Sequence, residues 1–237
     1  MVNGRAWSRG RGAARSGITL LLAAVAAVTF VMRSAPDAQA RDIDGLPAEL
    51  VGSGWAACPA PIDWVVDTST LTQAQAGREI ARLSRVLGIW SSATGLQFHY
   101  AGQRGLELSG STLVSQDGSP VPERTILIAF INDADAPMLD AATYGYASPS
   151  LIKASNREIV GAYAVLRADL AREGGRVRGR LLTNLYLHEL GHALGVGHVR
   201  EATAVMNPVV RPISHAFPQD LAVGNLPVVR PCLPATV

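Results

Sequence analysis

Charge is scarce in this sequence: Asp, Glu, Lys and Arg make up 17% of the 237 residues, and the formal net charge is +2. Even that small excess is concentrated at the N-terminus, where five arginines and one aspartate give residues 1–40 a charge of +4. Residues 41–237 therefore carry a net charge of −2. This balance excludes a basic surface of the kind that binds nucleic acid, so we expect no nucleic-acid partner.

Long apolar runs are also lacking. The N-terminal run Ile18–Met32 is shorter than the roughly 20 residues that a transmembrane helix needs. Four arginines precede it and the triplet Ala-Gln-Ala follows at residues 38–40, which is the order of a secretory signal peptide. We therefore interpret residues 1–40 as a signal peptide, cleaved before Arg41, and the rest as secreted. The alternative is an uncleaved anchor, which would hold the same domain at the outside of a membrane.

Cysteine is limited to Cys58 and Cys232, near the two ends of the exported part. An even number of cysteines at such positions in an exported protein predicts one disulfide bond. In the chain-entropy treatment, a bond that closes so long a loop contributes about 4–5 kcal/mol to stability if its geometry is unstrained. We therefore expect Cys58 and Cys232 to be joined.

The sequence contains no internal repeat and no change of composition that would mark a second domain. Apolar residues make up 48% of the chain, which is enough for one core of ordinary size. We expect an irregular lead-in over residues 41–57 and a single domain over residues 58–237.

Hydrophobic periodicity predicts a mixture of strands and helices along this domain. Alternating or continuous apolar residues predict strands at residues 62–67, 96–100, 125–131 and 159–166. Apolar residues spaced three to four apart predict helices at residues 72–94 and 176–194, with a short last helix at 218–223. Residues 102–124 are rich in Gly, Ser and Pro and are predicted to form a loop.

The most informative stretch is HELGHALGVGH, residues 188–198. His188 and His192 lie four residues apart, so they share one face of a helix, one turn apart. Gly195 is suited to end that helix in a left-handed conformation, after which the chain turns back and supplies His198. Three imidazole nitrogens can hold one zinc ion at ~2.0–2.1 Å and leave a fourth position for water, which is typical of a catalytic site.

Glu189 follows the first of these histidines and points to the side, where its carboxylate can approach a metal-bound water without binding the metal. Zinc lowers the pKa of such a water toward ~7 and polarises a carbonyl group. We therefore expect Glu189 to be the general base for the zinc-activated water and then the acid toward the leaving amine.

The pattern H-E-x-x-H-x-x-G-x-x-H, followed by a methionine turn, is the metzincin signature, and Val205-Met206-Asn207-Pro208 stands where that turn is expected. The chain thus resembles a metzincin zinc metalloendopeptidase, most of all the matrixins and their small secreted bacterial relatives. The resemblance implies an α+β metzincin (zincin-like) catalytic domain: a twisted, mostly parallel sheet with two long helices and an irregular C-terminal subdomain. It also implies that Met206 is an apolar floor under the metal, with Pro208 in the same structural turn.

Candidate substrate contacts follow from the same resemblance. Residues 144–148 stand where matrixins bind peptide along an edge strand, which makes Tyr146 and Ala147 candidates. Residues 209–215 stand where matrixins form the outer wall of the S1′ pocket, which makes Pro212 and Ile213 candidates.

The resemblance also bears on other metal sites and on the cysteines. One zinc is expected, because the chain lacks the further histidines with which animal matrixins bind a structural zinc. Asp133, Asp135 and Asp140 lack EF-hand spacing, so we interpret them as solvated turn residues, with Ca²⁺ binding as the alternative. The alternative for Cys58 is an inhibitory thiolate at the zinc, but its context Ala-Cys-Pro does not match the propeptide motif of the family, which favours the disulfide.

Together these expectations describe a secreted zinc-dependent endopeptidase, monomeric, that acts on peptide or protein substrates. One alternative is a non-catalytic secreted zinc-binding protein on the same fold, which the presence of Glu189 disfavours. The other is an amidase that cleaves cell-wall crosslinks, which would use the same attacking chemistry and differ only in its pocket.

Overall fold

The computed structural model describes residues 54–58, 60–136, 138–139, 143–153, 157–173, 176–198, 204–210 and 229–231. For residues 176–178 and 229–231 the description covers the backbone alone. The described residues all belong to one unit of the chain, Val31–Val237. The predicted signal peptide, residues 1–40, and the predicted last helix, 218–223, lie outside the described residues.

The described elements alternate between strands and helices along the chain. The strands are β1 (Trp55–Ala57), β2 (Ile62–Asp67), β3 (Phe98–Gln103), β4 (Leu106–Ser109), β5 (Thr112–Ser115), β6 (Thr125–Ile131), β7 (Gly145–Ile152), β8 (Ile159–Arg167) and β9 (Val229–Pro231). The helices are α3 (Gln73–Thr94), α4 (Ala168–Arg172) and α5 (Arg176–Ala193), with a 3-10 turn η1 (Asp133–Asp135).

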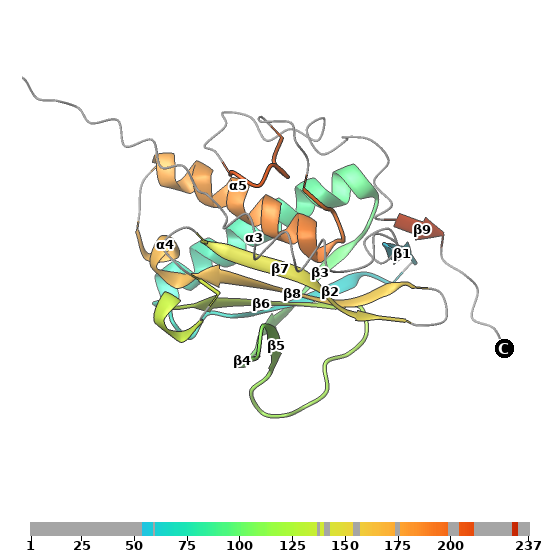
Figure 1. Ribbon diagram of the computed structural model, residues 1–237, viewed down its shortest axis with the longest axis horizontal. Helices are drawn as coiled ribbons and strands as arrows, with labels where there is room; N and C mark the ends of the chain where they lie inside the picture. The colour runs from blue at the N-terminus through green and yellow to red at the C-terminus, as the bar shows by residue number, and fades with distance from the viewer. Residues whose placement is uncertain are drawn as a thin grey trace, which may run out of the picture. The chain divides into compact units, whose positions relative to one another are not determined.

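One sheet of five strands, in the order β3-β2-β6-β8-β7, organises the domain. The first four strands of that order run parallel to one another, whereas the edge strand β7 runs antiparallel to β8. Figure 1 shows α3 and α5 on one face of this sheet and the β4–β5 hairpin on the other. The predicted class, α+β with a mostly parallel sheet and two long helices, is confirmed.

The central strand β6 explains why the sheet is covered on both faces. Its residues from Thr125 to Phe130 are all buried, as a continuous apolar run predicts for a strand between two layers. On the helix side, β6 side chains such as Ile128 and Phe130 join one core cluster with Leu83 of α3 and Leu187 of α5. This cluster fixes the height of both helices above the sheet.

Helix α3 begins and ends where its sequence predicts. Thr72 and Gln75 form a capping box, in which the Thr72 hydroxyl accepts from the Gln75 N–H and the Gln75 side chain accepts from the Thr72 N–H. At the other end Gly95 has φ 76°, and its N–H donates to the Ser91 carbonyl. The helix therefore stops before β3.

A buried polar group joins α3 to α5. The hydroxyl of Tyr186 on α5 donates to Glu79 Oε2 on α3 at 2.8 Å, and Arg82 Nη1 lies 3.2 Å from the same oxygen. Burial and the neighbouring carboxylate raise the pKa of Tyr186, so the phenol stays protonated and remains a donor. The bond holds the two long helices in a fixed register.

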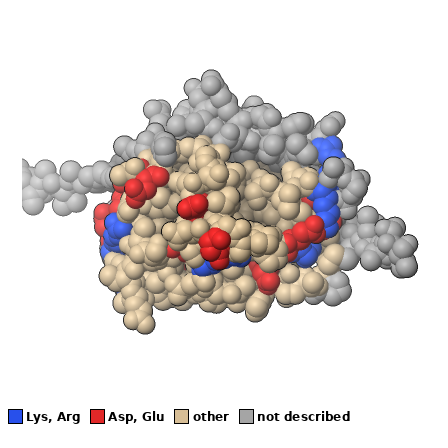
Figure 2. Space-filling model, turned by 90° about the horizontal axis from the view of Figure 1, so that it is seen from below, with Lys and Arg blue, Asp and Glu red and all other residues tan. Residues whose placement is uncertain are grey.

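The segment 102–124 corrects the prediction of a plain loop, because it contains the antiparallel hairpin β4–β5. The hairpin turns at Gly110, φ 64°, and places Leu106 and Leu113 in a second core cluster on the face of the sheet away from the helices. Asp67 at the end of β2 accepts from the Leu106 N–H at 2.7 Å. Figure 2 views this side of the molecule, where most surface side chains are uncharged and the described ones form no extended basic patch.

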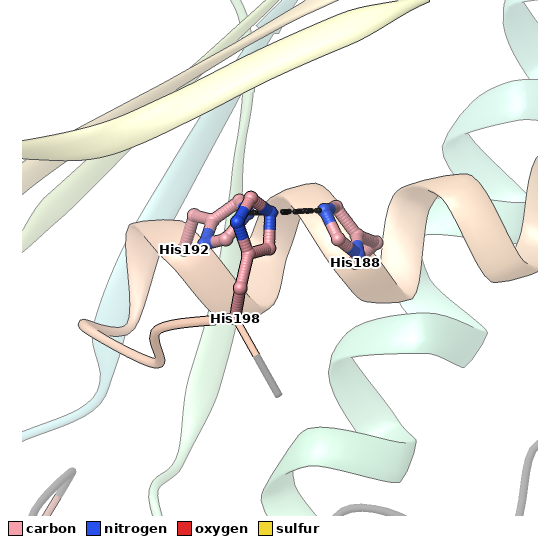
Figure 3. Close-up of side chains that lie close together, drawn as sticks. All are labelled: His188, His192 and His198. Carbon is pink, nitrogen blue, oxygen red and sulfur yellow. Dashed lines mark hydrogen bonds between the residues drawn. The ribbon is translucent and has the colours of Figure 1, made fainter. Parts of the chain in front are cut away.

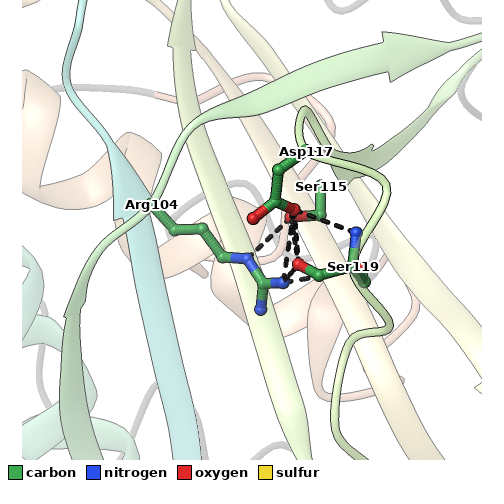
Figure 4. Close-up of polar contacts among 4 residues, drawn as sticks. All are labelled: Arg104, Ser115, Asp117 and Ser119. Carbon is green, nitrogen blue, oxygen red and sulfur yellow. Dashed lines mark hydrogen bonds and ion pairs between the residues drawn. The ribbon is translucent and has the colours of Figure 1, made fainter.

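A polar network holds the loop after β5 against β3 (Figure 4). Asp117 accepts from the Ser115 hydroxyl at 2.7 Å, from the Ser119 N–H at 2.9 Å and from the Ser119 hydroxyl. Arg104 adds a bond from Nε to the Ser115 hydroxyl at 2.7 Å. The Ser119 hydroxyl, and then that of Ser115, hold the pKa of the Asp117 carboxyl well below its usual range, so this network stays charged in neutral solution.

Other predicted boundaries were close, with three differences. The lead-in predicted to be irregular over residues 41–57 contains strand β1, which forms because β9, from the far end of the chain, pairs with it. The strand predicted at 96–100 is β3, which begins two residues later and runs on to Gln103. The short helix α4 was not predicted, since it follows β8 with no break residue and has a single turn of apolar residues to mark it. No helix in the described part of the chain is long and apolar enough to cross a membrane.

Candidate metal centre

The end of helix α5 and the loop after it place three histidines together. His188 and His192 lie one turn apart on α5, and the helix ends at Ala193. Gly195 has φ 91°, its N–H donates to the His192 carbonyl at 2.8 Å, and the Val196 N–H donates to the Gly191 carbonyl at 2.9 Å. These are the two bonds of a Schellman motif, which turns the chain back toward the helix.

The return brings His198 to the two helical histidines (Figure 3). The Nε2 atoms lie 3.0 Å apart for His188 and His192, 3.1 Å for His192 and His198, and 3.3 Å for His198 and His188. Three nitrogens bound to a tetrahedral zinc at ~2.0–2.1 Å lie about 3.3 Å from one another. Among the described residues these three histidines are the group that could hold a metal ion.

Backbone carbonyls fix the orientation of the two helical imidazoles. His188 Nδ1–H donates to the Val205 carbonyl at 2.8 Å, and His192 Nδ1–H donates to the Val196 carbonyl at 2.8 Å. An imidazole whose Nδ1 carries the proton presents the lone pair of Nε2, which is the form that binds a metal. The sequence predicted the ligands but not these two carbonyls, which come from the turns on either side of the site.

The helical histidines are almost completely buried, each with 1% of its surface exposed. Burial lowers the pKa of His188 to about 4 and that of His192 well below its ordinary value, with further lowering from the neighbouring imidazoles. Both side chains are therefore neutral near pH 7, as metal ligands must be.

Glu189 is buried as well, with 2% of its surface exposed, and its Oε2 has no hydrogen-bond partner among the described residues. Burial raises the pKa of this carboxyl to about 8. Burial of a carboxylate that accepts no hydrogen bond is unfavourable in free energy unless a positive charge or a water molecule contacts it. The three inward-facing Nε2 atoms and this orphaned oxygen fit a cation with a bound water, so the residues present suit the zinc that the motif implies.

Met206, in the predicted methionine turn, packs against helix α5. It is buried and packs so closely against α5 that a Cβ atom at Gly191 would lie 2.4 Å from its sulfur. The same Cβ would lie 2.9 Å from Trp90 of α3. Gly191 is therefore the residue that lets Met206 and Trp90 reach the helix beside His192.

Two tryptophans tie the backbone of the histidine-bearing helix to its surroundings. Trp90 Nε1–H donates to the Leu187 carbonyl at 3.1 Å, and Trp55 Nε1–H donates to the Ala193 carbonyl at 3.2 Å. Both tryptophans are completely buried. Trp90 lies in the helix predicted at residues 72–94, whereas Trp55 lies in the predicted irregular lead-in, and no local pattern connected Trp55 with the site.

One family model matches the part of the chain that contains this site. Residues 140–221, which contain the three histidines, Glu189 and Met206, match the model of the matrixin family, peptidase family M10. Over these residues the chain is similar to the matrixins.

Two solved structures also resemble the chain. Metalloproteinase-II from Bacteroides fragilis aligns with 66% of this chain and 49% of its own, at 14% identity and a TM-score of 0.37. Archaemetzincin from Methanopyrus kandleri aligns with 74% of this chain and 88% of its own, at 14% identity and a TM-score of 0.38. The chain thus spans about half the length of the Bacteroides fragilis protein. No curated protein matched the sequence.

The predicted substrate residues lie only partly within the described residues. Tyr146 and Ala147 lie on the edge strand β7, but they face opposite sides of the sheet. The Tyr146 ring packs edge-on against Tyr163, 6.1 Å between centroids, in the cluster away from α5, so its side chain does not face the histidines. Ala147 belongs to the cluster on the α5 side. Pro212 and Ile213 lie outside the described residues.

The predicted calcium alternative receives no support from the described aspartates. Asp133 pairs with Arg167 at 3.6 Å, and Asp135 accepts from Asn132 at 2.9 Å. Asp140 lies outside the described residues.

Proposed function

We propose that this chain is a matrixin-like metzincin and a secreted endopeptidase with one catalytic zinc, held by Nε2 of His188, His192 and His198. The observation that carries the proposal is the triangle of Nε2 atoms with sides of 3.0, 3.1 and 3.3 Å. The hydrogen bonds from His188 to the Val205 carbonyl and from His192 to the Val196 carbonyl leave these two imidazoles little freedom to turn away.

Bound zinc would supply a Lewis acid for the scissile carbonyl and would lower the pKa of an attacking water. Glu189 is the group of this chain placed to take up the proton of that water and to return it to the departing amine. Its burial supports this role, because a carboxyl that water does not solvate holds a proton more readily than an exposed one. A zinc ion nearby would lower the pKa of Glu189 again from the value of the metal-free chain, toward the ionised form that a base requires.

Strand β7 is the surface that we assign to the substrate backbone. It is the edge of the five-stranded sheet, and the Arg167 N–H donates to the Tyr144 carbonyl at 3.1 Å. In an antiparallel pair, alternate residues direct their backbone groups toward the partner strand, so the N–H and C=O of Ala147 are directed away from β8. A substrate peptide can add to that edge as a further strand.

Export and a disulfide complete the proposal. The order of charge, apolar run and small residues at residues 1–40 supports secretion. Strands β1 and β9 pair in parallel with Ala57 opposite Pro231, and Cys58 and Cys232 are the residues that follow these two in sequence. No free cysteine occurs in the described part of the chain. We assign one bond between Cys58 and Cys232.

The deciding experiment compares the secreted wild-type chain with Glu189→Gln. Purified protein is assayed for bound zinc and for cleavage of casein and of a peptide library. The matched control is Glu107→Gln, an exposed carboxylate on β4. We expect one zinc per chain in all three proteins. Cleavage should fall about 10²–10⁴-fold in Glu189→Gln alone, which is the usual range for loss of a general base.

Other outcomes would replace the proposal. A wild-type chain that binds one zinc and cleaves no substrate would be a zinc-binding protein. Cleavage of cell-wall crosslinks without cleavage of casein or library peptides would make it an amidase. The mass of the secreted chain tests export, with a start at Arg41 expected, and two titratable thiols under denaturing conditions would contradict the disulfide.

A further inference from the structure

Gly145, the first residue of the edge strand β7, lies directly against Glu189. A Cβ atom built at Gly145 would lie 3.0 Å from Glu189 Cγ and 3.3 Å from Glu189 Cδ. It would also lie 3.1 Å from the carbonyl oxygen of Val165. Ordinary van der Waals contacts of a Cβ begin at 3.4 Å, so a methyl group at this position would be too close to all three atoms.

Backbone conformation does not explain the glycine. Gly145 is not among the residues with positive φ, so an alanine could adopt its backbone angles. Glycine inside a strand costs roughly 0.5–1 kcal/mol relative to alanine, and it often marks a place where another group approaches closely. The close group here is the side chain of the proposed general base.

The surroundings determine which atoms would yield to a methyl group. The Val165 carbonyl belongs to β8, which is paired with β6 on one side and β7 on the other. A backbone held on both sides moves little, whereas the Glu189 side chain can rotate about its χ angles. The methyl group would therefore push Glu189 away from β7 by a few tenths of an ångström.

We infer that Gly145 is a positioning residue for Glu189: the absence of a side chain at the start of the substrate-binding edge strand provides the space in which the base is held. The inference rests on the proposed function of Glu189. It connects two parts of the site that are more than forty residues apart in sequence, because the strand that would receive the substrate also limits where the base can stand.

Gly161 is a matched control for this effect. It lies on β8, and a Cβ atom there would be 3.0 Å from the Leu151 Cβ and 3.3 Å from the Ser150 hydroxyl. The shortest contact is the same as at Gly145, but the crowding falls on residues at the far end of β7. Alanine at this position changes packing in the same sheet without contact to Glu189.

The experiment uses the full secreted chain and combines kinetics with thermal unfolding. Gly145→Ala and Gly161→Ala are each made in the wild type and in Glu189→Ala. In the wild-type background we expect Gly145→Ala to lower kcat about tenfold or more, since displacement of a reacting group by about 1 Å costs up to ~10²-fold. KM and zinc affinity should change less than about threefold, and Gly161→Ala should leave kcat unchanged.

Thermal unfolding of the zinc-free chains gives a readout that does not depend on catalysis. Gly145→Ala should lower Tm by about 2–4 °C in the wild type, which corresponds to about 1 kcal/mol in a domain of this size. In Glu189→Ala the contact to Cγ and Cδ is gone, so the drop should be at most half as large. The shift from Gly161→Ala should be the same in both backgrounds, as for independent sites.

Each other outcome overturns the inference. Equal Tm shifts from Gly145→Ala in both backgrounds would show that the methyl group does not act on Glu189. A rise in KM with unchanged kcat would assign Gly145 to substrate docking instead. If the wild type proves inactive, or if Glu189→Ala is as active as the wild type, the proposed function fails, and the unfolding experiment still decides whether Gly145 seats this side chain.

Discussion

The substitution Gly191→Ala should destabilise the candidate metal centre, because it crowds the side chains that pack against α5. The new Cβ would lie 2.4 Å from the Met206 sulfur and 2.9 Å from both Met206 Cε and Trp90. The sulfur contact is about 1 Å too short for ordinary packing, and overpacking of this kind costs typically 1–3 kcal/mol. Alanine in a helix returns about 0.5–1 kcal/mol relative to glycine. With an overpacking cost in the middle of its range, the net loss is about 1–1.5 kcal/mol, which corresponds to a fall in Tm of about 2–6 °C.

The same substitution should weaken zinc binding, because the displaced atoms are next to those that orient the ligands. Met206 follows Val205, whose carbonyl accepts from His188, and Gly191 precedes His192. Loss of a bond that orients a ligand typically costs 10–100-fold in metal affinity. We therefore expect Gly191→Ala to release zinc to a competing chelator at a concentration about 10–100-fold lower than the wild type.

Gly179→Ala is the control on the same helix. Its Cβ would meet Arg82 Nη2 at 3.8 Å, an ordinary contact, so this variant should be as stable as the wild type or slightly more so and should retain its zinc affinity. Adding Met206→Ala to Gly191→Ala removes two of the three crowding atoms, including the nearest, and should recover part of the zinc affinity. Wild-type Tm and zinc affinity in Gly191→Ala would refute the close packing of Met206 on α5.

Three further predictions concern the same site. As pH rises from about 4.5 to 8, zinc-free wild type should lose a few kcal/mol of stability relative to zinc-free Glu189→Gln, because burial raises the pKa of Glu189 to about 8 and the unfolded chain gives up this proton at lower pH. Urea titrations of both proteins at pH 5 and pH 8 measure this difference in stability, and a difference that is the same at both pH values would contradict the prediction. His198→Ala should lower zinc affinity at least tenfold, as measured by competition with a chelator; unchanged affinity would show that His198 does not bind the zinc. The Tm of the zinc-free chain, measured by calorimetry, should stay within about 2 °C of the wild-type value, because His198 is only partly buried and lies on the return loop. Trp90→Phe removes the donor to the Leu187 carbonyl and should lower Tm by about 2–8 °C, so a variant with wild-type Tm would show that this bond contributes nothing.

The meeting of the three histidines was predictable from sequence because the information is local. His188 and His192 are fixed by helix geometry alone, and Gly195 is the residue at which a helix can reverse. The confirmed strands β2, β6 and β8 and the confirmed helix α3 carry the same kind of local signal, an apolar period with a cap or a glycine at its end. Local patterns fix which elements form, and the motif fixes where the histidines meet.

Other parts of the site required the fold. The hairpin β4–β5 is short and lies in a stretch rich in Gly and Ser, so the sequence predicted a loop there in spite of the apolar residues Leu106, Leu108 and Leu113. Tyr146 was placed correctly on the edge strand, but the side of the sheet that it faces depends on register with β8. The contacts of Trp55 with Ala193 and of Gly145 with Glu189 join residues far apart in sequence, which no periodicity records.

The most direct test of the central claim is X-ray absorption at the zinc edge of the purified chain, with His198→Ala as comparison. The account predicts one zinc per chain in a shell of imidazole nitrogens at ~2.0–2.1 Å, with three imidazoles in the wild type and two in the variant. A zinc shell that contains sulfur, or one that is the same in the wild type and in His198→Ala, would contradict it.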